Sequence, residues 1–281
     1  MEPLRPFFKY FGSKYRSIKY YPKPLLGKIK EPFAGSATYS LYYYDLQVEL
    51  YDLNEDVCAV WDYLIHAKES ELRSLPGDVP STVEELHVCA EAKKLIGLCI
   101  DLGSTNPKQK PSAWMRRRKD LQRDNLPPQH GSFWDEYWRD RVADQVHLIR
   151  HWKIKNISYR YIPDEEAVWF IDPPYQHTTI RKAYRSNTID YRNLGEYCQN
   201  RSGQVMVCEQ YGATWLPFVK LCELSRTAIG SKEGNYIEAI WTKNCPETVS
   251  EPVKRITKCQ PSASEPTSHQ NPIKKLVRLG S

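Results

Sequence analysis

The chain has 281 residues, of which 41% are hydrophobic, and it contains eight tryptophans. This size and composition can bury one large domain with an insertion, or two small domains. No apolar run reaches the roughly 20 residues that span a bilayer, and no apolar signal segment is present, so we expect a soluble, cytoplasmic protein. The formal charge of +6 permits a polyanionic partner without requiring one.

The eight cysteines include no Cys-x-x-Cys pair, and several lie in apolar segments, where buried thiols occur. Without an export signal, reduced thiols are favoured over disulfides. His147 and His151 lie four residues apart on a predicted helix, but no second pair of ligands lies nearby. The sequence therefore predicts no metal site.

Two segments near the N-terminus have the features of ligand-binding turns. In Phe8–Lys14, a Gly-Ser step separates aromatic rings from Lys14, which is free to meet a carboxylate; the alternative is a basic, aromatic arm. Residues 29–37 predict a short strand and a tight turn, followed by a helix over residues 38–44. Gly35 allows the backbone to approach a ligand closely. Because only one glycine is present in this turn, we expect a small nucleoside ligand rather than a pyrophosphate.

A second strand is predicted over residues 48–54, with Asp52 at its end. Asp52 lies 17 residues beyond Gly35, and an acid at about this spacing grips the ribose hydroxyls in nucleotide-binding α/β units. The alternative is that Asp52 caps the next helix, residues 55–65, but Asn54 is available for that role. We favour the ribose role.

Residues 67–155 break the alternation of strands and helices. A capping box at residues 81–84 predicts a helix to about Cys99, and a second helix is predicted from Ser132 to about Trp152. Between them Trp114 adjoins a basic run of four residues, Arg116, Arg117, Arg118 and Lys119. This pattern suits contact with a phosphate backbone, although a solvated charged face is the usual explanation.

Strands resume at residues 156–161 and lead into the apolar run 168–171, which predicts a buried strand. Pro173 and Pro174 end this strand and leave Asp172 at its carboxyl end, where open α/β sheets bind ligands. Tyr175 follows on a stiff turn, so an acid and a ring can hold a planar group with an amine between them. The alternative is an ordinary strand end followed by a proline turn.

The rest of the chain contains two more predicted strands and a polar tail. A basic loop follows Tyr175 and contains Arg181, Lys182, Tyr184 and Arg185. Strands are predicted over residues 203–209 and 236–242. From about Cys245 the composition shifts to Pro, Ser, Thr, Lys and Gln, which predicts a disordered basic tail.

Taken together, these segments resemble the Dam-like family of DNA adenine-N6 methyltransferases, in particular its phage-type members. Four segments are similar to the family's motifs in the family's order: Lys9–Lys14 to the cofactor loop, Glu31–Ser36 to the S-adenosylmethionine turn, Asp52–Asn54 to the ribose-binding strand end, and Asp172–Tyr175 to the catalytic motif. Cys208–Glu209 with Trp215–Phe218 resembles a phage-type pattern. Ala37 stands where the family frequently has glycine. The resemblance covers about residues 7–243, the insertion excepted.

The resemblance implies an α/β fold, a Rossmann-like S-adenosylmethionine-dependent methyltransferase sheet with helices on both faces and a mainly helical insertion. Residues 1–66 and 156–243 would form the catalytic domain, residues 67–155 a DNA target-recognition region, and residues 244–281 a basic tail. The implied cofactor is S-adenosyl-L-methionine and the implied partner is double-stranded DNA, in the cytoplasm of a prokaryotic or phage-infected host cell. The resemblance is compatible with a biological role in restriction–modification, in evasion of restriction or in regulation.

The resemblance also assigns roles to individual residues. The implied cofactor-binding residues are Tyr10, Lys14, Glu31, Pro32, Phe33, Ala34, Gly35, Ser36, Asp52, Leu53 and Asp172. The implied catalytic residues are Asp172, Pro173, Pro174 and Tyr175: the Asp172 carboxylate and the Pro173 carbonyl each accept one hydrogen of the amine, and Tyr175 stacks on a flipped adenine. The implied DNA-binding residues are Arg116, Arg117, Arg118, Lys119, Arg181, Lys182, Tyr184 and Arg185.

The first residue of the catalytic motif bears on the substrate. Cytosine-N4 enzymes usually carry serine at this position, and protein-glutamine and many RNA enzymes carry asparagine, so Asp172 favours adenine in DNA. The Pro-Cys dipeptide typical of cytosine-C5 enzymes does not occur. Two alternatives stay open, a catalytically silent methyltransferase-like protein that binds DNA and an adenine methyltransferase that acts on RNA.

Overall fold

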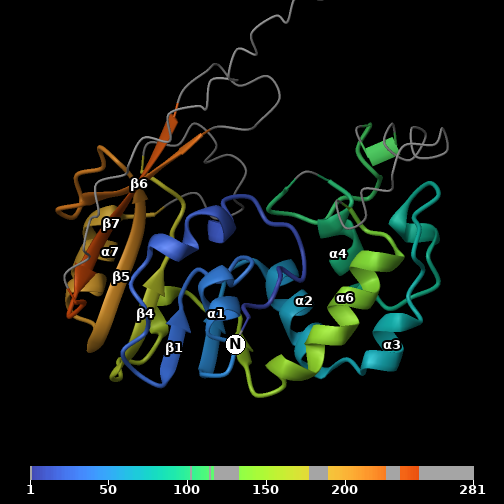
Figure 1. The fold of residues 1–281 in the computed structure, drawn as a ribbon, viewed down its shortest axis with the longest axis horizontal. Coiled ribbons are helices and arrows are strands. Elements are labelled where there is room, and N and C mark those ends of the chain that lie inside the picture. The colour runs from blue at the N-terminus through green and yellow to red at the C-terminus, as the bar shows by residue number, and fades with distance from the viewer. Residues whose placement is uncertain are drawn as a thin grey trace, which may run out of the picture. The chain divides into compact units, whose positions relative to one another are not determined.

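The computed structural model of the chain describes residues 2–101, 103–113, 115–116, 133–176, 189–225 and 235–246 (Figure 1). The chain divides into two compact units, residues 1–248 and residues 249–281. The second unit, which contains most of the predicted tail, lies outside the described residues.

A sheet of seven strands runs through the first unit, in the order β3-β2-β1-β4-β5-β7-β6. The strands are β1 (Lys28–Glu31), β2 (Gln47–Tyr51), β3 (Lys153–Lys155), β4 (Ala167–Ile171), β5 (Gly203–Gln210), β6 (Val219–Ser225) and β7 (Asn235–Lys243). β7 is antiparallel to both of its neighbours, and the other paired strands are parallel. This order, with its one antiparallel strand, is typical of the Rossmann-like methyltransferase fold.

Strand β4 is buried on both sides because helices cover both faces of the sheet. Val168 and Phe170 pack into the core cluster that contains α1 (Thr38–Tyr42) and α2 (Glu55–His66). Ala167, Trp169 and Ile171 pack into a second cluster with α7 (Tyr191–Gln199). The buried strand predicted from the apolar run is confirmed, and so is the predicted fold class.

The segment between α2 and β3 is helical in the part that the structure describes. It contains α3 (Glu69–Arg73), α4 (Ala90–Cys99) and α6 (Glu136–Val146), with short 3-10 helices η3 (Val83–Glu85) and η4 (His147–Ile149). Figure 1 shows these helices beside α2, at one end of the sheet. Within the described ranges, no helix is long and apolar enough to cross a bilayer.

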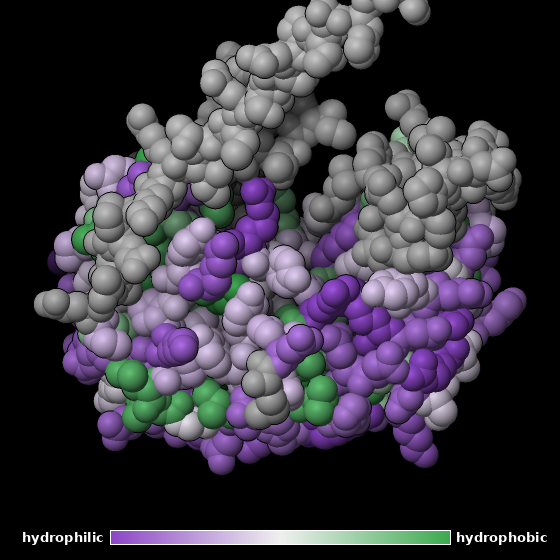
Figure 2. Space-filling view, in the orientation of Figure 1, coloured by the Kyte–Doolittle hydropathy of each residue, from purple (hydrophilic) through white to green (hydrophobic). Residues whose placement is uncertain are grey.

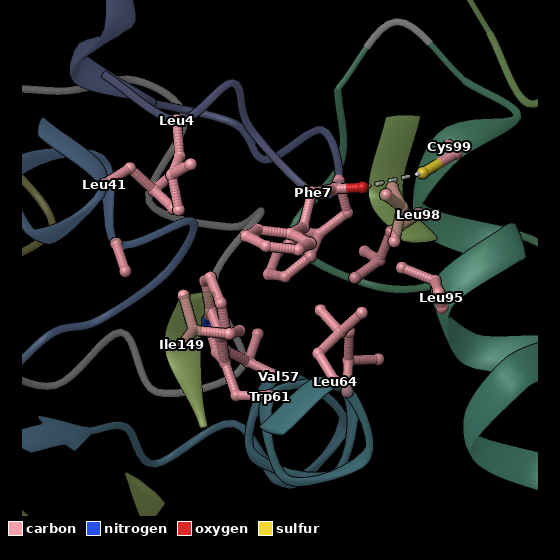
Figure 3. Packing of buried hydrophobic residues seen from close by; sticks show 14 of the residues in the cluster. Leu4, Phe7, Leu41, Val57, Trp61, Leu64, Leu95, Leu98, Cys99 and Ile149 are labelled. Atoms are coloured by element: carbon pink, nitrogen blue, oxygen red, sulfur yellow. Dashed lines mark hydrogen bonds between the residues drawn. The ribbon is translucent and has the colours of Figure 1, made fainter. Parts of the chain in front are cut away.

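The N-terminal segment joins the sheet to this helical segment. Leu4 donates its backbone N–H to the carbonyl of Leu41 at 3.0 Å, and the indole of Trp138 in α6 donates to the carbonyl of Phe7 at 2.9 Å. Figure 3 shows the ring of Phe7 over Trp61 of α2, between Leu41 of α1 and α4. The ring is fully buried. Two 3-10 helices follow, η1 (Lys14–Arg16) and η2 (Ile18–Tyr20).

The helix predicted from residue 81 to about Cys99 is interrupted. Thr82 accepts a hydrogen bond from the N–H of Glu84 as a cap should, but it caps only η3, and α4 begins at Ala90. The N–H of Val83 is bonded to the carbonyl of Gln109 at 2.9 Å. This tertiary contact overrides the local preference for one continuous helix.

The strand predicted over residues 156–161 is wrong. Pairing with β2 ends at Lys155, and residues 159–161 form the 3-10 helix η5 (Tyr159–Tyr161). The hydroxyl of Ser158 accepts from the N–H of Arg160 and caps this turn, so the local hydrogen bond wins over extension. The second long helix of the insertion is confirmed in a shorter form, since α6 begins after Asp135, whose carboxylate caps it.

Candidate functional site

The predicted cofactor-binding and catalytic residues lie at one edge of the sheet. The strand order reverses between β1 and β4, and ligands of open α/β sheets bind outside the carboxyl ends of the strands at such a point. The turn after β1 carries residues 32–37, Asp52 follows β2, and Asp172 follows β4. Because β7 is antiparallel, its first residues lie at this same edge.

The turn after β1 is fastened to its neighbours through the backbone. Ala34 donates its N–H to the carbonyl of Tyr51 at 3.0 Å, and Gly35 donates to the Asp52 carboxylate at 3.0 Å. The indole of Trp61 donates to the Gly35 carbonyl at 2.8 Å. The turn is therefore held by β2 and α2 before any ligand arrives.

Gly35 is required here for a reason that the sequence does not reveal. Its φ is +46°, in the left-handed region, and a Cβ atom at this position would lie 2.9 Å from the Tyr10 ring. Tyr10 thus closes over the turn from the cofactor loop. Ala37 also has a positive φ, +48°, so the position at which the resembling family frequently has glycine is strained here.

Asp52 connects the glycine turn to the end of β2. Its two carboxylate oxygens accept hydrogen bonds from the N–H groups of Gly35 and Asn54. The carbonyl oxygen of the Asn54 side chain accepts from Asp56 and caps α2, so the alternative that Asp52 caps this helix is wrong. Burial raises the pKa of Asp52, against the lowering by these backbone donors. The ribose role of Asp52 stays a prediction; the neighbouring Leu53 is 49% exposed.

The remaining residues of the turn are packed into the protein. The Glu31 carboxylate is 2% exposed and accepts from the N–H of Ser40 at 2.8 Å, so it fastens α1 to β1. Burial raises the pKa of Glu31 to about 8, so the group is largely protonated at neutral pH. Pro32 is buried, the Phe33 ring packs against Tyr159, and the Ser36 hydroxyl bonds to that of Thr38.

At the end of β4, Asp172 forms an ion pair with Lys14. The sequence indicated only that Lys14 is free to meet a carboxylate, without indicating which one. The Lys14 ammonium lies 2.8 Å from Asp172 Oδ1 and donates to the Gly12 carbonyl at 3.1 Å. Burial raises the pKa of Asp172 to about 6, although Lys14 lowers it. Burial lowers the pKa of Lys14, but the charges of Asp172 and Glu238 outweigh it and leave that pKa well above its usual value.

Two groups that the motifs did not indicate, Glu238 and Tyr21, complete this part of the site. Glu238 of β7 is 2% exposed, and its Oε1 atom accepts from the hydroxyls of Tyr21 and Tyr175 at 2.6 and 2.7 Å. Lys14 lies 3.7 Å from the same oxygen and 4.8 Å from the centroid of the Tyr175 ring. The sequence feature that could have identified Glu238 is its position as an acid within an otherwise apolar strand. Acidic residues are rarely buried without partners.

Glu209 stabilises the turn that carries Tyr175. Its buried carboxylate accepts from the N–H of Gln176 at 3.0 Å and from the indole of Trp215 at 2.9 Å. On the other side of the turn, the hydroxyl of Tyr191 donates to the Pro174 carbonyl at 2.6 Å. The phage-type pattern that contains Glu209 and Trp215 therefore lies against the predicted catalytic motif.

The predicted DNA-binding residues are mostly beyond what the structure describes. Arg116 is exposed, whereas Arg117, Arg118, Lys119, Arg181, Lys182, Tyr184 and Arg185 lie outside the described residues. Figure 2 shows that the visible face of the molecule is predominantly hydrophilic, with its apolar side chains in small, separate groups. Among the described residues, no group of three or more His, Cys, Asp or Glu side chains could hold a metal ion.

Comparison with known proteins adds little to this geometry. No protein-family model and no curated protein matches the chain. Among solved structures, the chain is similar to "Putative methyltransferase yhhF from Escherichia coli", with 8% sequence identity over 76% of this chain and 74% of that chain and a TM-score of 0.27. At that score the likeness carries no weight, and the fold assignment rests on the strand order.

The fold implies S-adenosylmethionine as a cofactor, and the residues present fit this group. Gly35 has no side chain, and the aromatic ring of Tyr10 lies against the turn at this residue. Asp52 offers carboxylate oxygens, which suit the two hydroxyl donors of a ribose. The glycine turn and the acid are joined by a hydrogen bond, so their spacing is set in advance.

Proposed function

We propose that the protein transfers a methyl group from S-adenosylmethionine to the N6 amine of an adenine flipped out of double-stranded DNA. One observation carries the proposal: Asp172 lies at the carboxyl end of β4, beside the point where the strand order reverses, with Tyr175 held next to it by fixed contacts. An acid and a ring at this edge suit a planar base that bears an amine.

The chemistry follows from the weakness of the nucleophile. The lone pair of the adenine amine is delocalised into the ring, so the nitrogen attacks poorly. Asp172 and the Pro173 carbonyl accept one amino hydrogen each, which turns the nitrogen toward tetrahedral geometry and aims its lone pair. The cofactor, when bound, supplies an electrophilic methyl group on sulfur. Positioning and fixed charges then provide most of the rate enhancement.

The residues around Asp172 have supporting roles in this mechanism. Tyr175 stacks on the extruded base, a contact worth about 1–3 kcal/mol in proteins that bind single strands. The Gly35 turn and Asp52 hold the nucleoside part of the cofactor. A base inside a duplex cannot reach this edge of the sheet, so extrusion is required.

Two measurements on the full chain test the proposal. Calorimetric titration with S-adenosylmethionine is expected to show binding, and sequencing of DNA from cells that express the protein is expected to show methylated adenines in one sequence context. DNA binding without cofactor binding would instead identify a silent methyltransferase-like protein. Methyl transfer to structured RNA but not to DNA would identify an RNA enzyme.

The activity is expected to fall at acid pH. Asp172 must be ionised to accept an amino hydrogen, and burial raises its pKa to about 6. The value of kcat/KM should therefore be constant above this pH and fall about tenfold for each unit below it. The measurement is tritiated methyl transfer to plasmid DNA between pH 5 and 8. A flat profile down to pH 5 would contradict the role of Asp172.

Neutralising Arg116, Arg117 and Arg118 together is expected to weaken DNA binding and to flatten its salt dependence. Each phosphate contact adds about one unit to the slope of log affinity against log salt, so loss of three contacts lowers the slope by about three. A filter-binding titration at several salt concentrations measures this slope.

The matched control for this triple variant neutralises Lys23, Lys28 and Lys243. Lys28 begins β1, and Lys243 pairs with Val205 near the start of β5, so these cations lie toward the opposite edge of the sheet. The control should keep the wild-type slope. If the arginine variant also keeps that slope, the three arginines belong to a solvated face.

A further inference from the structure

The cluster around Glu238 contains more than the predicted catalytic motif requires. A carboxylate that is 2% exposed is costly unless it is paired, and this one has three partners, Tyr21, Tyr175 and Lys14. Glu238 pairs with Gln210 of β5 and Cys222 of β6, so the strands on both sides fix its place in the sheet. A buried acid so firmly placed beside Asp172 calls for a function.

We propose that Glu238 is a positioning residue of the candidate active site. It fixes the ring of Tyr175 through the tyrosine hydroxyl, and it shares the ammonium of Lys14 with Asp172. This inference rests on the proposed function and adds to it a residue from β7 that lies outside all of the recognised motifs.

Glu238 restrains the ring of Tyr175. The turn 172–176 is held at its backbone by Glu209 and Tyr191, and the tyrosine ring packs against the core cluster. The bond from its hydroxyl to Glu238, at 2.7 Å, adds a directional contact at the far end of the ring. A ring already held in place loses less conformational entropy when a base stacks on it.

The substrate amine and Lys14 compete for the Asp172 carboxylate. The amine of the substrate and the ammonium of Lys14 are both hydrogen-bond donors to this carboxylate, and Lys14 already lies 2.8 Å from Oδ1. Glu238 Oε1 lies 3.7 Å from the same ammonium. A small movement therefore transfers Lys14 from Asp172 to Glu238, so that the buried ammonium keeps a carboxylate partner. Glu238 lets Asp172 engage the substrate.

The charges around Asp172 make this sharing measurable. Among the described residues, the titratable groups that face Asp172 or its partners are Lys14, Tyr21, Glu31, Tyr175, Cys208, Glu209, Tyr236 and Glu238. Burial raises the pKa of Tyr21, Tyr175, Tyr236 and Cys208, so these groups are neutral at pH 7. Of these groups, Lys14 lowers the pKa of Asp172, and Glu238 and Glu209 raise it.

Two substitutions separate the two parts of the proposal. Glu238→Gln keeps an oxygen that accepts from both tyrosine hydroxyls but removes the charge. Tyr175→Phe keeps the ring and the charge of Glu238 but removes the hydrogen bond. The control is Glu223→Gln on β6. Glu223 pairs with Ile237, the residue before Glu238, but its side chain is exposed, so this variant removes a nearby acid that lies outside the buried cluster.

The variants are compared by the pH profile of kcat/KM for methyl transfer to plasmid DNA. In the Glu238→Gln variant, Lys14 is expected to stay on Asp172. The fall of kcat/KM on the acid side of the profile (the acid limb) should then occur about half to one pH unit lower, and kcat at pH 7.5 should be about tenfold lower. Tyr175→Phe is expected to raise KM for DNA about tenfold with the limb unmoved. The affinity for S-adenosylmethionine should stay within twofold of wild type in all three variants.

The result that overturns the proposal is a Glu238→Gln variant with the acid limb of the wild type, or a Tyr175→Phe variant with an unchanged KM. A second readout is independent of methyl transfer: the titration of Asp172 followed by ¹³C NMR of its carboxyl, assigned with Asp172→Asn. If wild type methylates no adenine in DNA, the proposed function fails, and the NMR titration still decides. An Asp172 titration that Glu238→Gln leaves unmoved refutes the sharing of Lys14.

Discussion

Replacing Asp172 with alanine is expected to reduce methyl transfer about 100–1,000-fold while the affinity for S-adenosylmethionine stays within a few-fold of wild type. The variant removes the acceptor that orients the amine, and loss of a single such fixed electrostatic contact costs about 10²–10³ in rate elsewhere. The glycine turn and Asp52 are untouched, because they contact each other rather than Asp172. Tritium transfer and calorimetry on the same preparation measure both quantities.

The structure also indicates why this variant should fold. Lys14 would lose its partner at 2.8 Å but keep Glu238 at 3.7 Å, so the buried ammonium is not left alone. Asp172→Asn, which preserves the volume, checks this, and Asp62→Asn on the exposed face of α2 is the control expected to match wild type. Near-normal turnover by Asp172→Ala would remove Asp172 from the mechanism.

Replacing Gly35 with alanine is expected to weaken the binding of S-adenosylmethionine about 10–100-fold. Two costs add at this position. A side chain at a φ of +46° is strained by about 1–2 kcal/mol, and its Cβ would lie 2.9 Å from the Tyr10 ring, which must move. The free variant relieves these costs by relaxing the turn, and the cofactor must restore the turn when it binds. Since each 1.4 kcal/mol is a tenfold change in affinity, strain and displacement together give this range. Calorimetric titration with the cofactor measures it.

Gly27 provides a matched control for this substitution. A Cβ atom at Gly27 would have nothing within 4 Å, so Gly27→Ala should bind the cofactor as wild type does. Thermal unfolding of both variants separates a local loss of affinity from a general loss of stability. Equal affinities in the two glycine variants would mean that the turn after β1 does not form the cofactor site.

Sequence patterns predicted the strands that carry the site. Strand β4 is an apolar run stopped by two prolines, and β1 and β2 are short runs followed by a proline and an acid. Asp52 and Asp172 were placed at the same sheet edge by their positions after β2 and β4. The structure adds that Asn54 caps α2, which leaves the Asp52 carboxylate directed to the glycine turn. The roles of these acids toward cofactor and base remain predictions.

The contacts that the sequence could not predict are those between distant segments. Glu238 lies 63 residues from Tyr175, and the two meet because β7 enters the sheet antiparallel beside β5. Strand β6 was not predicted, because the polar and apolar residues of Val219–Ser225 do not alternate regularly, and the segment gains its structure by pairing with β7. Helix α7 was also missed, and the Asp190 carboxylate that caps it gave a signal that was available.

The N-terminal segment has a consequence for any attempt to divide the protein. Phe7 and Phe8 are fully buried between the sheet and the helices that follow α2, and burial of each such ring contributes about 1.5–3 kcal/mol. Those helices expressed without residues 4–8 would expose the apolar surface that Leu95 and Trp138 now share with this segment. We therefore expect the helical segment to aggregate as an isolated fragment, and a chimera that exchanges this segment to fold only if the first residues are exchanged as well.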